Sequence, residues 1–446
     1  MKVLKFGGTS VGTVTSLTAV KAIVEAQDKP VIIVVSALGG VTDMLIATAK
    51  AAAAGDTQGY LETFARIRSR HTDVITGIVP TDRQPYVSER ARQMLEELAN
   101  IFKGVSLLRD LSPRSLDIIV SYGERLSSMI ISNIIADATL FDSRKFIKTT
   151  DQFGKHVLEP STNTLVEEAF SAAEFKVAVV PGFISTDIHT GDITNLGRGG
   201  SDYTAAIIAA TLAADTLEIW TDVDGFMTAD PRIVKDAEVI DRLDFVEAME
   251  LCNFGAKVVY PPTIYPVFHR NIPILIKNTF NPTASGTLIG EGQGLQADYH
   301  APTVGVSSIK GVTLLALEDC RDCSSRMVNA LSRCGIEALM PSADHHCCAV
   351  KSADLGKALE ALADEFAAEL TAGAEIKQVA DLAIVAAVGR AVTPERMARS
   401  VRAIYPPEQV SAQTVACMVR MDQTDLAINA IHSDIILTDF KRHHQI

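Results

Sequence analysis

Short runs of branched aliphatic residues, separated by stretches with helical periodicity, constrain the fold of residues 1–290. Residues 31–36 (Val-Ile-Ile-Val-Val-Ser) form a continuous run, and residues 177–181, 217–221 and 274–277 resemble it. Such runs are typical of parallel strands that are covered on both faces. Between residues 44 and 111 the apolar residues instead recur at helical spacing. This alternation predicts one large α/β domain with a parallel-rich sheet.

The pattern changes after residues 286–294, which are rich in glycine and polar side chains and mark a domain boundary. Beyond the boundary the predicted elements are shorter. They are strands at 312–317, 336–340 and 347–351 with helices at 324–334 and 355–366, then strands at 382–388 and 415–420 with helices at 394–404 and 424–431, and a short final strand. Two consecutive units of this kind indicate a tandem repeat of small α+β modules.

Composition argues against several classes of protein. The chain has 446 residues, of which 47% are hydrophobic, so it can bury sizeable cores. Its formal net charge is −13 and it has no basic run, which disfavours a nucleic-acid-binding surface. The longest apolar stretches, such as residues 205–214, are too short to cross a bilayer. We therefore expect a cytoplasmic protein with no nucleic-acid or membrane partner, and with reduced cysteines.

The first candidate site is the sequence Lys-Val-Leu-Lys-Phe-Gly-Gly-Thr-Ser-Val at residues 2–11. A short apolar run ends at Gly7 and Gly8, and hydroxyl residues follow at once, as where a strand leads into a helix. The paired glycines let backbone N–H groups converge on an anion, and Lys5 adds a positive charge. Two interpretations stay open for this fragment alone: a phosphate-binding loop, and an ordinary strand-to-helix turn with a surface lysine.

A second anion site is predicted at residues 191–202, Gly-Asp-Ile-Thr-Asn-Leu-Gly-Arg-Gly-Gly-Ser-Asp. Its glycines form a flexible loop before a predicted helix, whose free N–H groups and dipole favour phosphate. Arg198, inside this loop, can bind a carboxylate or phosphate through two nitrogens. Helix capping by Ser201 or Asp202 is the structural alternative. Capping alone does not explain an arginine between glycines, so the anion site is favoured.

Two further motifs are less specific. Residues 220–232 follow a predicted strand, which places them at the carboxyl edge of the sheet, where α/β proteins bind ligands. Residues 121–125 (Ser-Tyr-Gly-Glu-Arg) open a predicted helix after a predicted strand at 116–120. Glu124 would then lie in the first helical turn. The helix dipole and a bound substrate ammonium explain a carboxylate there about equally well.

Several common catalytic motifs are missing from the sequence. It has no Gly-x-x-x-x-Gly-Lys-Ser/Thr, no Gly-x-Gly-x-x-Gly after a strand, no His-Glu-x-x-His and no Gly-x-Ser-x-Gly. Their absence disfavours P-loop nucleotidases, Rossmann oxidoreductases, zinc proteases and α/β-hydrolases. Lys5, two glycine loops and an embedded arginine point instead to phosphoryl transfer without a Walker motif.

Six motifs, in order, resemble those of the aspartate kinases within the amino acid kinase family. They are residues 5–11 (Lys-Phe-Gly-Gly-Thr-Ser-Val), 121–125 (Ser-Tyr-Gly-Glu-Arg), 196–202 (Leu-Gly-Arg-Gly-Gly-Ser-Asp), 221–225 (Thr-Asp-Val-Asp-Gly), 229–232 (Ala-Asp-Pro-Arg) and 254–257 (Phe-Gly-Ala-Lys). The resemblance covers essentially the whole chain. It implies a three-layer, carbamate-kinase-like α/β domain.

The resemblance also implies a reaction. The γ-phosphoryl group of ATP would pass to the side-chain carboxylate of L-aspartate with Mg²⁺, giving 4-phospho-L-aspartate, the first step of lysine, threonine and methionine biosynthesis. A carboxylate nucleophile carries no proton at neutral pH, so no general base is needed. Catalysis can rest on positioning and charge stabilisation. Lys5 would bridge the transferring phosphoryl group, and Asp202 would orient Lys5 and help to manage the metal.

Binding roles follow from the same resemblance. Arg198 would hold a substrate carboxylate and Glu124 the substrate ammonium. The implied substrate-binding residues are Thr42, Glu124, Arg198 and Ser201, and the implied nucleotide-binding residues are Lys5, Gly7, Gly8, Ser10, Gly199, Gly200, Thr221, Asp222, Met227, Arg232 and Lys257. Met227 stands where the family usually has tyrosine. No residue is assigned as a dedicated metal ligand.

The C-terminal repeat resembles paired ACT modules, which are ferredoxin-like, one inserted in the other. The predicted domains are therefore a catalytic domain at 1–290 and a regulatory region at 301–446, with one module at about 311–379 and the other at about 301–310 with 380–446. Residues 302–310 would form a strand of the second module. A homodimer or homotetramer is implied, with a lysine or threonine effector. Residues 319–325 lack the glycine usual at the effector site, which weakens that last expectation.

Two other functions are considered. A glutamate-type amino acid kinase, or one acting on an acylated amino acid, would share the phosphate motifs, but the paired ACT modules disfavour it. A non-catalytic amino-acid sensor would use those modules alone, but the intact Lys5, Arg198 and Asp202 disfavour it.

A zinc site is a further alternative, suggested by Cys320-x-x-Cys323 with the sequence His-His-Cys-Cys at 345–348. Consecutive residues of a strand point to opposite faces, and a single Cys-x-x-Cys is a weak signal. Buried thiols are the favoured interpretation.

Overall fold

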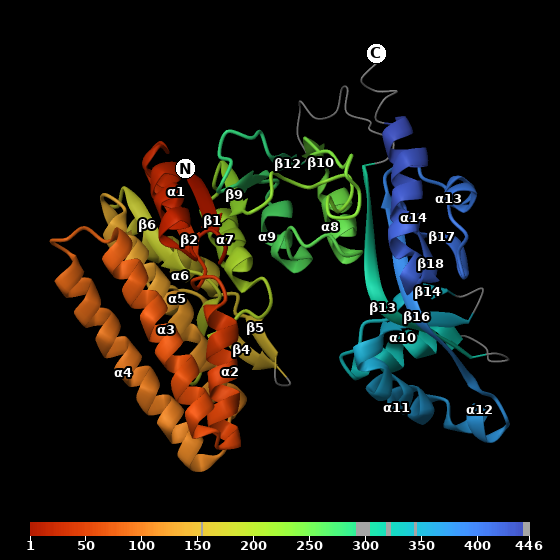
Figure 1. Cartoon of the computed structure of the whole chain (residues 1–446), viewed down its shortest axis with the longest axis horizontal. Helices are drawn as coiled ribbons and strands as arrows, with labels where there is room; N and C mark the ends of the chain where they lie inside the picture. Colours follow the sequence, from red (N-terminus) through yellow and green to blue (C-terminus); the bar gives the residue numbers. More distant parts are fainter. Residues whose placement is uncertain (153–154, 291–303, 318–322, 343–345, 440–446) are drawn as a thin grey trace. The chain divides into compact units, whose positions relative to one another are not determined.

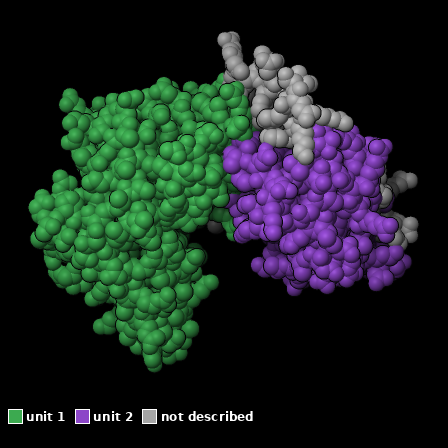
Figure 2. Space-filling view, turned by 45° about the horizontal axis from the view of Figure 1, so that its top comes forward, with its two compact units in different colours: residues 1–226, 241–245, 258–293 green, residues 227–240, 246–257, 294–446 purple. Residues whose placement is uncertain are grey.

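The computed structural model describes residues 1–152, 155–290, 304–317, 323–342 and 346–439 (Figure 1). The chain forms two compact units (Figure 2). Unit 1 consists of Met1–Phe226, Asp241–Phe245 and Val258–Gln293, and unit 2 consists of Met227–Ile240, Val246–Lys257 and Gly294–Ile446. Two segments that precede the predicted boundary near residue 290 thus belong to unit 2. None of the helices in the described ranges has the length and apolar character of a membrane span.

The core of unit 1 is an eight-stranded sheet in the order β10-β12-β11-β9-β1-β2-β6-β3. Its strands are β1 (Lys2–Phe6), β2 (Val31–Val35), β3 (Ala138–Leu140), β6 (Val177–Pro181), β9 (Thr216–Thr221), β10 (Arg242–Leu243), β11 (Ile274–Asn278) and β12 (Thr287–Ile289). Neighbouring strands are parallel except for β11 and β12. The four apolar runs correspond to β2, β6, β9 and β11, and β2 and β6 are buried at every position. The predicted parallel-rich sheet is confirmed.

Helices cover both faces of this sheet. They are α1 (Val14–Glu25), α2 (Val41–Ala54), α3 (Thr57–Ile78), α4 (Gln84–Leu108), α5 (Pro113–Ile134), α6 (Thr162–Ser171), α7 (Gly200–Thr211) and the short α9 (Tyr265–Phe268). Leu4 and Phe6 of β1 pack in one apolar cluster with residues of α1 to α5. Helix α7 contacts β1, β2 and β9 but does not belong to that cluster, so it covers the opposite face. Unit 1 therefore has three layers.

A small second sheet in unit 1 has the order β5-β4-β7-β8, formed by β4 (Lys148–Gln152), β5 (Lys155–Leu158), β7 (Ile184–Asp187) and β8 (Ile193–Asn195). The chain leaves β8 directly into the loop that carries Arg198. This sheet is absent from the sequence-based prediction.

The prediction of a strand at 116–120 is wrong, because these residues lie inside helix α5. Ser112 caps that helix by accepting a hydrogen bond from the Ser115 N–H, and Pro113 occupies its first turn. Glu124 therefore lies in the middle of a long helix rather than in its first turn. The helix dipole at an N-terminus does not account for this carboxylate.

Unit 2 contains a six-stranded antiparallel sheet in the order β14-β15-β13-β16-β18-β17. Its strands are β13 (Gly305–Leu317), β14 (Leu339–Ser342), β15 (Cys347–Lys351), β16 (Ile376–Val388), β17 (Tyr405–Ser411) and β18 (Thr414–Arg420). Its helices are α8 (Phe245–Asn253), α10 (Cys323–Arg333), α11 (Leu355–Glu365), α12 (Ala367–Thr371), α13 (Pro394–Ser400) and α14 (Thr424–Ile431). Helix α8 begins at the last residue of a unit 1 segment. Strands β13 and β16 pair along both halves, with a register shift next to Gly311. Each half of this long pair carries its own helices and edge strands, which gives an α+β region with two related halves.

Two details of unit 2 differ from the prediction. The short final strand is wrong, because a π-helical turn at His432–Ile436 follows α14. Strand β17 was not predicted, since it contains two prolines, and prolines are tolerated on an edge strand but obscure its pattern. Of the predicted strand at 302–310, residues 302 and 303 lie outside the described residues, and residues 305–310 form part of β13.

Four of the described cysteines of unit 2, namely Cys323, Cys347, Cys348 and Cys417, lie in its apolar clusters, whereas Cys334 is exposed and Cys252 is partly buried. Cys347 and Cys348 are consecutive in β15 and belong to different apolar clusters, so their side chains point to opposite faces. Among the described residues no group of three or more histidine, cysteine or acidic side chains could hold a metal ion. Cys320, His345 and most of residues 319–325 lie outside the described residues. Cys323 is disulfide-bonded, so the expectation of reduced thiols is wrong at this position.

Candidate active site

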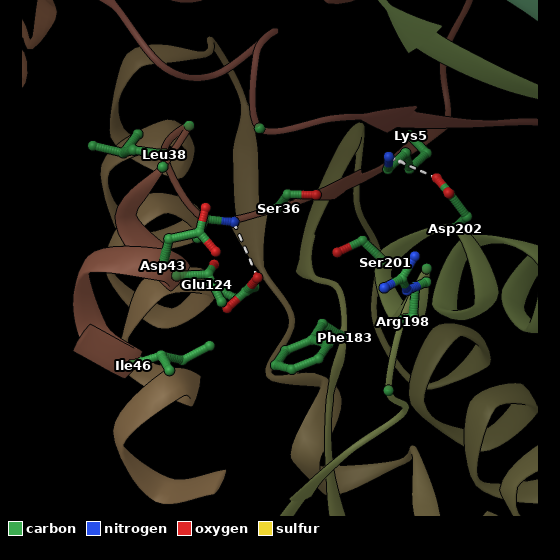
Figure 3. A pocket seen from close by; sticks show the side chains of 18 residues that line it. Lys5, Ser36, Leu38, Asp43, Ile46, Glu124, Phe183, Arg198, Ser201 and Asp202 are labelled. Atoms are coloured by element: carbon green, nitrogen blue, oxygen red, sulfur yellow. Dashed lines mark hydrogen bonds and ion pairs between the residues drawn. The ribbon is translucent and has the colours of Figure 1, made fainter. Parts of the chain in front are cut away.

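A cavity of about 570 Å³ lies at the carboxyl ends of β1, β2 and β6 (Figure 3). Open α/β sheets bind ligands at this edge. The cavity is lined by Lys5, Gly8, Ser36, Ala37, Leu38, Gly39, Gly40, Thr42, Asp43, Ile46, Glu124, Phe183, Gly197, Arg198, Gly199, Gly200, Ser201 and Asp202. It therefore brings together both predicted catalytic residues and all the predicted substrate-binding residues.

Lys5 and Asp202 form an ion pair at one side of the cavity. The Nζ atom of Lys5 lies 2.6 Å from Oδ1 of Asp202, and both side chains are largely buried. Lys5 comes from β1 and Asp202 from the first turn of α7, so two layers of unit 1 hold the pair. A buried carboxylate fixes the direction of the ammonium more firmly than a solvated one, because both charges have lost water.

Two helices begin at the wall of the cavity. Helix α2 follows Gly40, and helix α7 follows Gly199; both glycines have left-handed backbone conformations, with φ of 78° and 68°. Neither helix start has a side-chain cap. Their first N–H groups and the positive ends of their dipoles therefore favour anions in the cavity.

Gly199 is constrained by packing as well as by its conformation. A Cβ atom at this position would lie 2.5 Å from Cβ of Tyr260. Only glycine meets both demands at this position.

Arg198 is exposed and projects into the cavity beside Ser201. The loop that carries it is held at its base, where the Asn195 side chain accepts a hydrogen bond from the Gly197 N–H at 2.8 Å. Asn195 in turn donates to Asp117 of α5 at 2.6 Å. A guanidinium that stands free on an anchored loop is suited to bind a carboxylate through two nitrogens.

Glu124 lies across the cavity from Arg198 and Lys5 (Figure 3). Its Oε1 atom accepts a hydrogen bond from the Ala37 N–H at 3.2 Å, whereas Oε2 is buried without a hydrogen-bond partner among the described residues. Burial raises the pKa of Glu124 to about 8, against the opposing effect of the Ala37 N–H. A cation that binds here would ionise the carboxyl group and pair with the free oxygen.

Gly123 permits this placement of Glu124. A Cβ atom at position 123 would lie only 2.7 Å from Cβ of Ala37, so helix α5 can approach the loop after β2 only with glycine there. Close approach brings the neighbouring carboxylate within reach of the Ala37 N–H. Gly123 thus positions the Glu124 carboxylate through close packing of α5, which the sequence motif alone did not reveal.

Several predicted nucleotide-binding residues do not line the cavity. The Gly7 N–H donates to the Trp220 carbonyl at 3.2 Å, and the buried Ser10 hydroxyl lies 2.7 Å from that of Thr279. Thr221 is the last residue of β9 in unit 1 and Asp222 follows it, and their side chains are hydrogen-bonded to each other. Met227, Arg232 and Lys257 belong to unit 2, and Arg232 there pairs with Asp230.

Six cavity-lining residues with side chains were not predicted as functional: Ser36, Ala37, Leu38, Asp43, Ile46 and Phe183. Asp43 directly follows Thr42, so the same motif could have indicated it. Phe183 has a left-handed φ of 67°, which is uncommon for an aromatic residue, and its N–H donates to the Thr204 hydroxyl. Its position directly after the Pro-Gly that ends β6 was the available signal.

Several known proteins are similar to this chain. Residues 1–278 match the model of the amino acid kinase family. The chain is 35% identical over 296 residues to the lysine-sensitive aspartokinase 3 of Escherichia coli, an alignment that covers 64% of this chain and 63% of that protein. Matches to other curated relatives, such as the chloroplastic aspartokinase 1 of Arabidopsis thaliana, span about half of their length.

Solved structures extend the similarity to the whole chain. The structure of E. coli aspartokinase III in complex with aspartate and ADP has a TM-score of 0.81 at 27% identity, covering 98% of this chain and 99% of that one. The structure of the same enzyme with lysine and aspartate has a TM-score of 0.76. Because the family model spans well over half of the sequence, this chain belongs to the amino acid kinase family.

Proposed function

We propose that this chain is an aspartate kinase, which transfers the γ-phosphoryl group of ATP to the side-chain carboxylate of L-aspartate. The observation that carries the proposal is the distribution of charge around one cavity, with Lys5, Asp202 and Arg198 on one side and Glu124 on the other. A free amino acid carries a carboxylate and an ammonium that match Arg198 and Glu124. The similar E. coli enzyme was crystallised with aspartate and ADP, which supports the same substrates here.

The proposed chemistry needs no proton acceptor. An oxygen of the ionised aspartate side chain attacks the γ-phosphorus, the bond from that phosphorus to the β–γ bridging oxygen breaks, and ADP leaves. Lys5 neutralises negative charge on the phosphoryl group as it passes between the two oxygens. Asp202 keeps the Lys5 ammonium directed at that position, and the N–H groups at the starts of α2 and α7 add further positive potential.

Substrate positioning would come from four side chains. We assign the α-carboxylate of aspartate to Arg198 and Ser201, its ammonium to the free oxygen of Glu124, and a further contact to Thr42. Holding the acceptor in this way makes the reaction effectively unimolecular and so lowers the entropic part of its activation free energy.

Nucleotide and metal binding remain part of the proposal. The nucleotide would use Gly7, Gly8, Ser10, Gly199, Gly200, Thr221, Asp222, Met227, Arg232 and Lys257 together with Lys5. Mg²⁺ usually binds through one or two carboxylates and the phosphates of its nucleotide. Asp202 is a carboxylate in a suitable place, and the bound ion would neutralise phosphate charge.

The C-terminal α+β region is proposed to be regulatory. We assign it two ACT modules, one inserted in the other, that bind lysine or threonine and join copies of the chain into a homodimer or homotetramer. Lysine is favoured because the similar E. coli structure contains it. Inhibition of turnover by lysine but not by methionine, and a dimer or larger species in light scattering, are the expected results.

The catalytic proposal is tested by trapping the acyl phosphate. Incubation with ATP, Mg²⁺, aspartate and hydroxylamine should give the aspartyl hydroxamate. The Arg198→Ala variant should raise the KM for aspartate about 10- to 100-fold, the worth of a charged hydrogen-bond pair. Phosphorylation of glutamate or an acylated amino acid with aspartate inert would favour another amino acid kinase. Amino-acid binding without ATP binding would favour a sensor.

A further inference from the structure

Arg70 connects the two loops that face each other at the cavity. It lies on α3, outside every motif of the sequence, and it does not line the cavity. Its Nη1 atom donates to the Gly39 carbonyl at 2.6 Å, and its Nη2 atom donates to the Gly12 carbonyl at 3.1 Å. Gly12 belongs to the loop after β1, here called the phosphate loop (residues 7–12), and Gly39 to the loop after β2, here called the acceptor loop (residues 36–40).

The two loops approach each other through backbone atoms. A Cβ atom on Gly39 would lie 2.8 Å from the Gly8 carbonyl oxygen, and one on Gly12 would lie 3.4 Å from the Gly39 nitrogen. Glycine side chains supply neither packing nor hydrogen bonds to hold such a contact. A guanidinium has separate nitrogens in a rigid plane, so it can fix two carbonyl groups at a set distance.

The bridge also sets the direction of a peptide plane at the cavity. The Gly39 carbonyl points to Arg70, and in a trans peptide the N–H of Gly40 points the opposite way. Gly40 directly precedes the first residue of α2, and it lines the cavity. Arg70 therefore acts on both the spacing of the loops and the orientation of the helix start.

We propose that Arg70 is a positioning residue that holds the phosphate loop and the acceptor loop in register, so that donor and acceptor are aligned for transfer. This inference rests on the proposed function. Without Arg70 the phosphate loop would still bind nucleotide, and Glu124, which accepts a hydrogen bond from Ala37 of the acceptor loop, would still bind aspartate, whereas the alignment between the substrates would be lost. Misplacement of reacting groups by about 1 Å can cost on the order of 100-fold in rate.

The test compares Arg70→Met with Arg66→Met, an exposed arginine on the same helix. We expect kcat of Arg70→Met to fall about 100-fold with both KM values changed less than about threefold, and Arg66→Met to match the wild type. Arg70→Lys, which offers one nitrogen instead of two, should stay at least about tenfold impaired. The proposal would be overturned by any of three results. They are a wild-type kcat in Arg70→Met, full activity in Arg70→Lys, and an effect of Arg70→Met that is confined to the KM of one substrate.

A second measurement is independent of turnover. Hydrogen exchange of backbone amides should become faster in both the phosphate loop and the acceptor loop of Arg70→Met. If that variant does not fold, the same result is expected for Arg70→Lys. In Arg66→Met the exchange rates of both loops should match those of the wild type. Unchanged exchange in either loop overturns the bridge. If the wild type does not phosphorylate aspartate, the proposed function fails, and the exchange result still decides whether Arg70 couples the loops.

Discussion

The ammonium nitrogen of Lys5 lies 2.6 Å from a carboxylate oxygen of Asp202, and the two side chains are only 12% and 13% exposed. The residues are far apart in the sequence and come from different layers of unit 1. Their pairing places a fixed positive charge at the carboxyl edge of the sheet without a Walker motif. Lys5 is therefore the residue whose removal should affect chemistry most directly.

Replacing Lys5 by alanine should lower kcat about 1000-fold, because the charge that opposes the developing negative charge on the phosphoryl oxygens is removed. Hydroxamate formation at saturating substrates measures this loss. Lys21→Ala, a half-exposed lysine on α1 whose ammonium lies near Glu25, is the control and should retain wild-type turnover. A Lys5→Ala enzyme with more than a tenth of wild-type kcat would contradict the assigned role.

Glu124 should make aspartate binding depend on pH. Burial raises its pKa to about 8 in the free protein, so below pH 8 the carboxyl group is mostly protonated and must lose its proton to pair with an ammonium. The affinity for aspartate should therefore rise, by up to about tenfold per pH unit, between pH 6 and 8, and then level off. Calorimetry with wild type and Glu124→Gln checks this. Binding that is independent of pH in the wild type would count against the ammonium contact.

The same carboxyl group should lower stability as the pH rises. Its folded-state pKa lies above the ordinary value of 4.5, so the folded state binds more protons than the unfolded state between pH 4.5 and 8. The free energy of unfolding should fall through this window by up to about 1.4 kcal/mol per pH unit relative to Glu124→Gln. Urea unfolding followed by Trp220 fluorescence measures it, and parallel pH profiles for the two proteins would refute it.

His71 should act in the opposite direction. Burial lowers the pKa of His71 to about 4, so the unfolded state binds the extra proton as the pH falls from 6.5 to 4. The wild type should therefore lose about 2 kcal/mol of unfolding free energy between pH 7 and pH 5 relative to His71→Met. Unfolding followed by Trp220 fluorescence serves again, because both residues belong to unit 1. An equal loss in the two proteins would exclude His71 as the cause.

Gly123→Ala should damage the substrate site through packing. The added methyl group would lie 2.7 Å from Cβ of Ala37, so α5 must move away and the Glu124 carboxylate with it. We expect the KM for aspartate to rise at least about tenfold with a loss of about 1–3 kcal/mol in stability. Gly104→Ala in α4 is the matched control, since nothing lies within 4 Å of the new atom. It should gain about 0.5–1 kcal/mol without changing KM.

The sequence predicted the sheet of unit 1 and most of the cavity, but it placed Glu124 on the wrong kind of element. Residues 119–134 of α5 are buried at nearly every position although several of them, such as Ser121, Ser127 and Ser128, are polar, so the buried positions do not follow the pattern of apolar residues. The branched residues at 118–120 then resemble a strand. The family motif still identified Glu124, because a motif records which residues occur together and not the element that carries them.

Other features depend on contacts that a linear pattern does not contain. Arg70 has no motif, and its importance follows from two carbonyl groups that lie 31 and 58 residues before it. The segment that carries Met227 and Arg232 likewise belongs to unit 2 because its residues Ala229 and Val234 pack in one apolar cluster with residues of β13, β16 and α14. Such relationships become visible only when the fold brings distant segments together.

The interleaving of the two units has a consequence for any attempt to divide the protein. Ala229 and Val234 are buried by Val306, Ile428 and their neighbours, all of which come after residue 290. A gene fragment ending there would retain these two side chains but none of the other buried residues of their cluster, and exposed apolar surface promotes aggregation. Expression of a stand-alone N-terminal fragment therefore calls for redesign of segment 227–240, and a single cut at the apparent boundary is not enough.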